Sequence, residues 1–516
     1  METRRYPIGI QSFSEIITGN YVYVDKTRYV YDIANLYKYV FLSRPRRFGK
    51  SLLTTTLESY FLGRKELFKG LAIDSLETEW NTYPVLHFDM SWAKLGTIED
   101  ISSMLDDQLD TYERKYGIPK KYNDFNVRLQ MLIAGCAEKY NTQSVVLIDG
   151  YDSQMLNVID DPDKLEMIHN FMFSFYAPLK SCDQYLRFVF LTGLTKFSQG
   201  NIFGGLNNLL DISMSPKYST VCGISQSEIE SQLMDDVKAL AEEQNVTTEE
   251  ALIKLNQQYG GYQFSEESDE LLEPFSLFSA LSDLEFNNYW IETYLPSVLA
   301  GKMKEFHTHL PIIDPAQTFA DVFYQPMECM TSILPILYQS GYVTIKDYDR
   351  DTDRYLLGIP NKEVAYGLMN SLVPYYVSPD TLTTSNTMID MYSDLRHDNM
   401  DSALNRLKVF MAALPYELEN KTEKHFQTII FVIFKMMTKY VDVEISTATG
   451  RIDMVLKTNT HIYVMEFKLD KSAEEAIAQI DTKDYLISYQ LDDRKKVKVG
   501  INFSSETRTL DDWIIA

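Results

Sequence analysis

The sequence runs Phe41-Leu-Ser-Arg-Pro-Arg-Arg-Phe-Gly-Lys-Ser-Leu-Leu53, an apolar strand that passes through a tight loop into a helix. Gly49 lets the backbone approach an anion, and the first turn of the helix offers free N–H groups at its positive end. Lys50 is placed to reach the β- and γ-phosphates of ATP, and the Ser51 hydroxyl to ligate Mg²⁺. The predicted nucleotide-contacting residues are Arg44, Pro45, Arg46, Arg47, Phe48, Gly49, Lys50, Ser51 and Leu52.

The loop departs from the full phosphate-binding pattern G-x-x-x-x-G-K-[ST] at one position. Arg44 stands where that pattern has its first glycine, so a residue with a Cβ must make the turn. An ordinary strand-to-helix turn is therefore the alternative interpretation of the loop taken alone.

Two further apolar strands support nucleotide binding. Gln143 to Asp152 reads as a buried strand that ends in Asp149, like a Walker B strand, and Leu186 to Gly193 is the third strand. Because ligands of parallel sheets bind beyond the carboxyl ends of the strands, we expect Asp149 to meet Lys50 and Ser51 and to hold the Mg²⁺ shell. Thr192 or Thr195 is expected to sense the γ-phosphate.

A second site is predicted near the end of the chain, where two β-type runs, residues 451–456 and 461–469, flank a polar turn. The period of two in a strand places Asp453 on one face of its strand and Glu466 with Lys468 on one face of the next. Burying these charges is costly unless they neutralise one another or hold a metal. An exposed hairpin with solvated charges is the alternative.

Each residue of this second site has an expected role. Asp453 and Glu466 would ligate Mg²⁺, or alternatively Mn²⁺, which activates a water for phosphodiester cleavage, and Lys468 would orient the nucleophile or offset charge. Helices extend the set: Glu423 and Gln427 share one helix face ahead of the strands, and Gln479 lies on the helix that follows them. The pattern is the Asp, then Glu-x-Lys, arrangement of PD-(D/E)XK nucleases.

Several segments together resemble a known bacterial family. Tyr6-Pro-Ile-Gly-Ile-Gln11, Tyr21 to Thr27, the loop of residues 44–51 and Ser215-Pro-Lys-Tyr218 are similar to the AAA-ATPase-like family whose members carry a C-terminal PD-(D/E)XK nuclease-superfamily domain. The resemblance implies an α/β multidomain protein. Its expected parts are a P-loop NTPase domain with a parallel sheet (1–224), a helical lid (225–300), a winged-helix-like middle region (301–400) and a restriction-endonuclease-like α/β domain (401–516).

One position departs from the family. The second strand of its members usually reads Asp-Glu-Tyr-Asp, whereas this chain has Asp149-Gly150-Tyr151-Asp152, so the acid expected to orient the attacking water is absent. Groups of this kind contribute roughly 10²–10⁴-fold to catalysis, so ATP hydrolysis is predicted to be weak or absent while binding survives. Asp152 is an alternative source of the carboxylate if the turn brings it back toward the phosphates.

The net charge and the cysteines limit which partners and which cellular compartment we expect. The net charge of −24 disfavours a nonspecific nucleic-acid binder. Residues 401–516 hold 16 Lys and Arg against 18 Asp and Glu, so the predicted nuclease region is the least acidic part and is compatible with DNA or RNA. Four scattered cysteines and the lack of a membrane-spanning run predict a cytoplasmic protein without a membrane partner.

Two interpretations of function remain. In the first, the chain is an ATP-binding, metal-dependent nuclease in which the P-loop module gates the C-terminal site, with nucleic acid as its partner. In the second, it is an ATP-bound switch or scaffold of the signal-transduction type that recruits a protein partner through a non-cleaving, nuclease-like fold. The sequence leaves an oligomeric state open in both.

Overall fold

The computed structural model describes residues 5–92, 96–196, 209–290, 302, 316–325, 330–376, 381–412, 429–430, 432–434, 437, 442–445 and 453–516. The chain divides into two compact units. One consists of Met1–Tyr289 with Phe319–Asp353, and the other of Trp290–Thr318 with Arg354–Ala516. The finer division into four domains remains a prediction.

A five-stranded sheet lies at the centre of the first unit, and its paired strands are all parallel. The strands follow the spatial order β2-β3-β4-β1-β5. Their bounds are β1 Tyr39–Ser43, β2 Val85–Asp89, β3 Ser144–Asp149, β4 Leu186–Gly193 and β5 Leu210–Asp211. All six residues of β3 are buried, as expected for a parallel strand covered on both faces. The three strands expected from the sequence are thus β1, β3 and β4.

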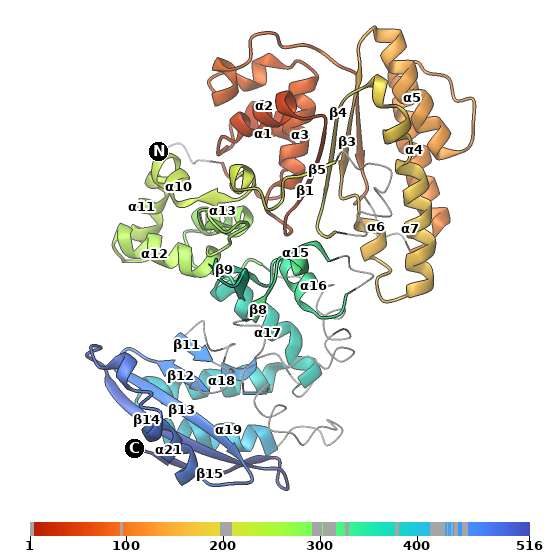
Figure 1. Cartoon of the computed structure of the whole chain (residues 1–516). Helices are drawn as coiled ribbons and strands as arrows, with labels where there is room; N and C mark the ends of the chain where they lie inside the picture. The colour runs from red at the N-terminus through yellow and green to blue at the C-terminus, as the bar shows by residue number, and fades with distance from the viewer. Residues whose placement is uncertain are drawn as a thin grey trace. The chain divides into compact units, whose positions relative to one another are not determined.

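Helices cover both faces of this sheet, with α1, α2 and α3 on one face and α4, α5 and α7 on the other (Figure 1). The bounds are α1 Phe13–Thr18, α2 Thr27–Leu36, α3 Lys50–Phe61, α4 Ile98–Tyr116, α5 Phe125–Tyr140, α6 Ser153–Leu156, α7 Pro162–Tyr176 and α8 Pro178–Ser181. Short 3-10 helices lie at Lys65–Phe68, Ala72–Ser75, Asp183–Tyr185 and Pro216–Tyr218. The α3 helix starts directly after Gly49, whose left-handed φ of 93° suits a residue without a Cβ.

A helical subdomain follows the sheet along the chain. It contains α10 Gln226–Gln232, α11 Met234–Glu243, α12 Thr248–Tyr259 and α13 Pro274–Asp283, with the short strands β6 Ile224–Ser225 and β7 Leu271–Leu272. Capping boxes start α10 at Ser225 with Glu228 and α12 at Thr247 with Glu250. Thr247 and Glu250 thus form the Thr-x-x-Glu arrangement that is typical of a helix start. The remaining elements of this unit are α15 Asp321–Tyr324, α16 Leu334–Gln339 and β9 Thr344–Asp349.

The second unit contains a helical part and a sheet. Its first elements are β8 Ala316–Thr318, β10 Arg354–Gly358, α17 Lys362–Tyr376, α18 Thr381–Arg396 and α19 Met400–Ala412. The five-stranded C-terminal sheet has the order β11-β12-β13-β14-β15. Its bounds are β11 Asp442–Ile445, β12 Met454–Lys457, β13 His461–Leu469, β14 Lys495–Ser504 and β15 Thr509–Ile515, with α21 Ala473–Thr482 and a 3-10 turn Ile487–Tyr489.

The C-terminal sheet is mixed, since β13 and β14 are parallel and the other neighbours antiparallel. Alternate residues of β13 face opposite ways. Ile462 and Val464 join a core with Ile480 of α21, while Met465 and Phe467, from the intervening positions, are also buried. The helix α21 therefore covers the face of the sheet that carries the even-numbered residues of β13.

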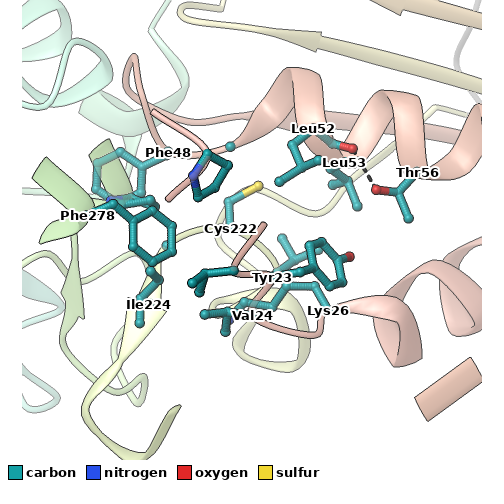
Figure 2. A pocket seen from close by; sticks show the side chains of 16 residues that line it. Tyr23, Val24, Lys26, Phe48, Leu52, Leu53, Thr56, Cys222, Ile224 and Phe278 are labelled. Atoms are coloured by element: carbon teal, nitrogen blue, oxygen red, sulfur yellow. Dashed lines mark hydrogen bonds between the residues drawn. The ribbon is translucent and has the colours of Figure 1, made fainter. Parts of the chain in front are cut away.

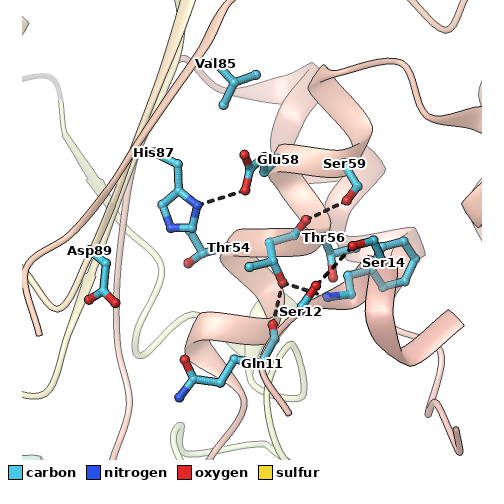
Figure 3. Close-up of polar contacts among 12 residues, drawn as sticks. Gln11, Ser12, Ser14, Thr54, Thr56, Glu58, Ser59, Val85, His87 and Asp89 are labelled. Carbon is cyan, nitrogen blue, oxygen red and sulfur yellow. Dashed lines mark hydrogen bonds and ion pairs between the residues drawn. The ribbon is translucent and has the colours of Figure 1, made fainter. Parts of the chain in front are cut away.

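His87 on β2 and Glu58 on α3 form an ion pair between the first sheet and the helix that starts at the loop (Figure 3). The His87 Nδ1 atom lies 2.9 Å from Glu58 Oε2. Burial acts to lower the pKa of His87, but the hydrogen bond and charge of Glu58 outweigh it, so the pKa is raised above its ordinary 6.5. Burial acts to raise the pKa of Glu58, and the bond with His87 outweighs that effect, so this pKa is lowered.

We expect His87→Gln to reduce the free energy of unfolding by about 1.5–3 kcal/mol at pH 6, because a charged hydrogen bond is lost. A raised folded-state pKa gives stability that is fully present below the unfolded pKa and is lost as the pH rises through the folded value. The difference between wild type and variant should therefore shrink between pH 6 and pH 9 in urea titrations. The exposed His397→Gln serves as control, and a difference that grows with pH would contradict the charged pair.

Candidate nucleotide site and nuclease site

The loop between β1 and α3 holds the Lys50 ammonium in its centre. Lys50 Nζ donates hydrogen bonds to the carbonyl oxygens of Arg44 and Pro45, each at 2.9 Å. Burial lowers the pKa of Lys50, and the neighbouring carboxylate of Asp149 opposes that shift. The ammonium is thus bound by neutral carbonyl groups, which a polyphosphate would replace as the stronger partner.

The side chain of Arg44 points into the protein. Its guanidinium donates to the carbonyl oxygen of Ser213 at 2.6 Å and to those of Tyr218 and Ser219 at 3.3 Å. It also lies 4.2 Å from the ring centre of Phe264. Only 2% of Arg44 is exposed, and burial lowers its pKa. The residue that replaces the first glycine of the pattern therefore anchors the loop to residues 213–219, so its side chain is not a phosphate ligand in this conformation.

The other loop residues divide between core and surface. Phe48 is buried in edge contacts with Tyr262 and Phe264, with ring centres 4.7 and 5.2 Å away. Arg46 and Arg47 are exposed. Arg47 has a φ of 65°, donates to the carbonyl oxygen of Tyr289 at 2.8 Å and stacks over Phe275. A Cβ on Gly341 would lie 2.7 Å from Cβ of the buried Pro45, so the turn after α16 packs directly against the loop.

Asp149 meets the start of α3, as the Walker B interpretation requires. Its carboxylate lies near the Ser51 hydroxyl and near the Lys50 ammonium. Burial raises the pKa of Asp149, while Ser51 and Lys50 act in the opposite direction. A carboxylate and a hydroxyl that touch each other beside a phosphate-binding loop are suitable oxygen ligands for Mg²⁺.

The two threonines expected to sense a phosphate both use their hydroxyls within the protein. Thr192 Oγ1 donates to the carbonyl oxygen of Leu42 at 2.9 Å, across the β4–β1 pair. Thr195 Oγ1 donates to Asp152 at 2.7 Å. The sensing role of Thr192 stays a prediction, and it would require the hydroxyl to exchange the Leu42 carbonyl for the phosphate.

Asp152 faces the end of β4. Its Oδ2 accepts from the Leu194 N–H at 2.9 Å and from the Thr195 N–H at 2.6 Å, in addition to the Thr195 hydroxyl. The residue is 1% exposed. A carboxylate with three donors on one oxygen and almost no exposure stabilises the loop after β4, which leaves it poorly suited to orient a water.

A pocket of about 320 Å³ adjoins the loop. Its walls come from the N-terminal segment Pro7–Gln11, from Gly49 to Leu52 and from Phe275 and Phe278 of α13. A smaller hollow of about 70 Å³ lies on the other side of Pro7 and Phe278, among Tyr23, Val24 and Cys222 (Figure 2). The sequence analysis assigned Gly49 to Leu52 to nucleotide binding and used Tyr6 to Gln11 for the family resemblance, but it gave Phe275 and Phe278 no role.

The second site lies in the C-terminal sheet. Glu466 Oε1 accepts hydrogen bonds from Lys468 Nζ at 3.0 Å and from Gln479 Nε2 of α21. Asp453 precedes β12, and its Oδ2 accepts from the N–H of Phe467 at 2.9 Å. Burial raises the pKa of Glu466, with Lys468 acting against the shift. The structure thus brings Asp453, Glu466, Lys468 and Gln479 together.

Glu466 provides a test of metal binding. Its Oε2 atom is buried and makes no hydrogen bond with the described residues, although the carboxylate and the backbone N–H of Asp453 both lie near the Glu466 carboxylate. Two converging carboxylates with an oxygen that lacks a donor fit a divalent cation. The described ranges contain no cluster of three or more His, Cys, Asp or Glu that could hold a metal. Glu423 and Gln427, predicted to join the site, lie outside those ranges.

Family models match both ends of the chain. Residues 7–203 match the AAA-ATPase-like family, described as predicted AAA-ATPase, and residues 421–513 match the PD-(D/E)XK nuclease superfamily. The chain combines an AAA-ATPase-like domain with a PD-(D/E)XK nuclease-superfamily domain. The family resemblance and the α/β multidomain fold class expected from the sequence are therefore confirmed.

Two individual proteins are also similar. An uncharacterized protein in the vnfD 5′ region of Azotobacter chroococcum mcd 1 is 28% identical over 527 residues, covering 100% of this chain and 99% of its own. The ORC2 protein of Aeropyrum pernix, solved in ADPNP and ADP complexes, is 13% identical. That match covers 65% of this chain and 87% of the ORC2 chain with a TM-score of 0.23, too low to support a structural conclusion. Among the described residues, no helix is long and apolar enough to span a membrane.

Gly500 lets α21 approach the nuclease-superfamily sheet. It lies opposite Glu466 in the β13–β14 register. A Cβ at this position would lie 2.5 Å from the backbone oxygen of Ala473 and 2.8 Å from Cγ1 of Ile477, both in α21. The absence of a side chain therefore allows the helix that supplies Gln479 to pack at its observed distance. Spacing within the sequence gave no signal for this role.

We expect Gly500→Val to push α21 outward and to reduce the free energy of unfolding by roughly 1–3 kcal/mol, as overpacked cores do. The shift should also separate Gln479 from Glu466. Thermal unfolding measures the first effect, and amide hydrogen exchange of α21 the second. Gly96→Ala is the control, because a Cβ there would meet nothing within 4 Å. Equal stability of Gly500→Val and wild type would contradict the packing argument.

Proposed function

We propose that the protein is an ATP-binding, metal-dependent nuclease in which the P-loop module gates the C-terminal phosphodiesterase site. The observation that carries this proposal is the convergence of Asp453, Lys468 and Gln479 on the Glu466 carboxylate, whose Oε1 has two donors and whose buried Oε2 has none among the described residues. The substrate class is nucleic acid, DNA or RNA. The gating is supported by the presence of both domains in one chain.

Each residue of the proposed nuclease site has a different role in phosphodiester cleavage. Glu466 and Asp453 would hold the divalent cation, Mg²⁺ or alternatively Mn²⁺, which supplies an activated water and charge stabilisation when bound. Gln479 and Lys468 fix the Glu466 carboxylate through its other oxygen. The Lys468 ammonium also neutralises charge that develops on the phosphate oxygens. Burial keeps this cluster in a low dielectric, where each of these interactions is stronger.

The nucleotide site supports ATP binding more directly than turnover. Lys50 and the N–H groups at the start of α3 would bind the phosphates, and Ser51 and Asp149 would hold Mg²⁺. The pocket between Pro7–Gln11 and α13 is open to the base and ribose. Because Gly150 replaces the expected acid, ATP hydrolysis is weak or absent, and the bound nucleotide acts mainly as a conformational signal.

A second function has one observation in its favour. Glycine at position 150 suits a protein that stays ATP-bound, so the alternative is a signal-transduction-type switch or scaffold that recruits a protein partner through a non-cleaving fold. A cytoplasmic location agrees with both proposals. The two functions differ in whether the Glu466 cluster cuts nucleic acid.

Lys50→Ala is expected to weaken ATP·Mg²⁺ binding by at least about tenfold, because the phosphates lose their buried cationic partner. Isothermal titration calorimetry with the full chain measures the change. Lys164→Ala, an exposed lysine of α7, is the matched control and should bind as wild type does. Equal affinity of wild type and Lys50→Ala would rule out the P-loop assignment.

Glu466→Gln and Lys468→Met are each expected to reduce metal-dependent cleavage by at least about 10²-fold while ATP affinity stays within twofold of wild type. The assay uses single- and double-stranded DNA and RNA with Mg²⁺ or Mn²⁺, with and without ATP. Glu474→Gln, an exposed position at the start of α21, is the control. Cleavage by both variants at the wild-type rate, or none by wild type on any substrate, would favour the switch.

A further inference from the structure

Gly150, which stands where the acid is expected, lies close to the end of the neighbouring strand β2. Gly150 has a φ of 67°, and a Cβ there would lie 2.6 Å from Ser153 Oγ and 3.3 Å from Ser91 Cβ. Ser91 follows β2, the strand next to β3. A glutamate at position 150 would therefore be strained by the positive φ, would collide with the Ser153 hydroxyl and would lie tight against Ser91. The turn after β3 thus passes close to Ser91 at the end of β2 and has no room for an acid at position 150.

That serine holds a carboxylate. The Ser91 N–H and hydroxyl both donate to Asp89 Oδ1, at 2.8 and 2.6 Å. The side-chain amide of Gln108 on α4 fixes the Asp89 backbone, with its Oε1 and Nε2 each 3.0 Å from the Asp89 N and O atoms. The hydrogen bonds that the described residues make to this carboxylate use Oδ1, which leaves Oδ2 for another partner. Asp89 is only partly buried.

The carboxylate faces the nucleotide site. Asp89 is the register partner of Asp149, and Met90 N–H donates to the Asp149 carbonyl oxygen at 2.9 Å. Register partners on adjacent parallel strands project to the same face and lie about 4.8 Å apart. Asp149 meets Ser51 of α3 on that face, and His87, two residues before Asp89, meets Glu58 of the same helix (Figure 3). Both contacts place Asp89 on the side of the sheet where the phosphates would bind.

The other candidate groups near Lys50 are already engaged. One carboxylate oxygen of Asp152 accepts three hydrogen bonds, from the Leu194 N–H and from the N–H and hydroxyl of Thr195. The Thr192 hydroxyl donates to the Leu42 carbonyl oxygen. Asp149 is the expected partner of Mg²⁺ with Ser51. Asp89 is therefore the carboxylate at this edge of the described sheet that has both a fixed orientation and an accessible oxygen.

Resting on the proposed ATP binding, we propose that Asp89 is the carboxylate that orients the attacking water and accepts its proton during ATP hydrolysis. The water oxygen forms a bond to the γ-phosphorus while the bond from that phosphorus to the β,γ-bridging oxygen breaks. The electron pair of the broken bond leaves with ADP, inorganic phosphate is the second product, and the proton on Asp89 passes to solvent.

The test is single-turnover hydrolysis of radiolabelled ATP by excess full-length protein with Mg²⁺. Asp89→Asn should lower the rate by roughly 10²-fold, the usual contribution of a general base, while calorimetric affinity for ATP·Mg²⁺ stays within twofold of wild type. Ser91→Ala should lower the rate by a smaller factor, because the carboxylate is still present but less firmly oriented. Asp89→Glu should retain measurable hydrolysis. The exposed Asp163→Asn on α7 is the matched control.

The outcomes separate this inference from the proposed function. ATP binding by wild type with no hydrolysis, or an unchanged rate in Asp89→Asn, overturns the role of Asp89 and leaves the ATP site in place. A fall in ATP·Mg²⁺ affinity that equals the fall in rate assigns Asp89 to nucleotide or metal binding and also overturns it. Failure of wild type to bind ATP overturns the proposed function itself.

Discussion

The alternation of side chains along a strand is the constraint on which both sites depend. In the first sheet, parallel register places the ends of β2 and β3 side by side, so Asp89 and Asp149 project to the face covered by α3. In the C-terminal sheet, the same alternation sends Glu466 toward α21 and the neighbouring Met465 and Phe467 to the opposite core. A slip of one residue in either register would bury these carboxylates in the wrong layer.

Buried charges decide how each site is built. Arg44 is held by carbonyl oxygens and an aromatic ring, and Lys50 by two loop carbonyls. Neutral acceptors of this kind satisfy the hydrogen-bonding needs of a cation but do not cancel its charge. Glu466 is different, because the Lys468 ammonium binds one of its oxygens and no described residue donates a hydrogen bond to the other. The two arrangements therefore support different proposals, an anion at the first site and a cation at the second.

The sequence predicted the features that local patterns determine. The strand, glycine, lysine and serine of the loop, the Asp149 strand and the Asp453, Glu466 and Lys468 spacing all follow from periodicity within a few residues. It did not reveal that Arg44 donates to carbonyl oxygens about 170 residues away along the chain. Nor did it reveal that α21 packs closely against Gly500, or that Asp89 lies beside Asp149. These depend on strand order and on contacts between distant segments, which one sequence does not encode locally. Glu423 was predicted from helix spacing and lies outside the described residues.

The contact between Pro45 and Gly341 connects the loop to a distant part of the same unit. Lys50 binds the Pro45 carbonyl oxygen, and the Pro45 ring packs against the α-carbon of Gly341, between α16 and β9. If the Lys50 ammonium turned to a bound phosphate, the Pro45 carbonyl would lose its partner. Any rearrangement at Pro45 would then have to be accommodated at Gly341, which has no side chain that could move aside. A change in the loop at Pro45 would therefore reach the turn before β9 directly, through the proline ring.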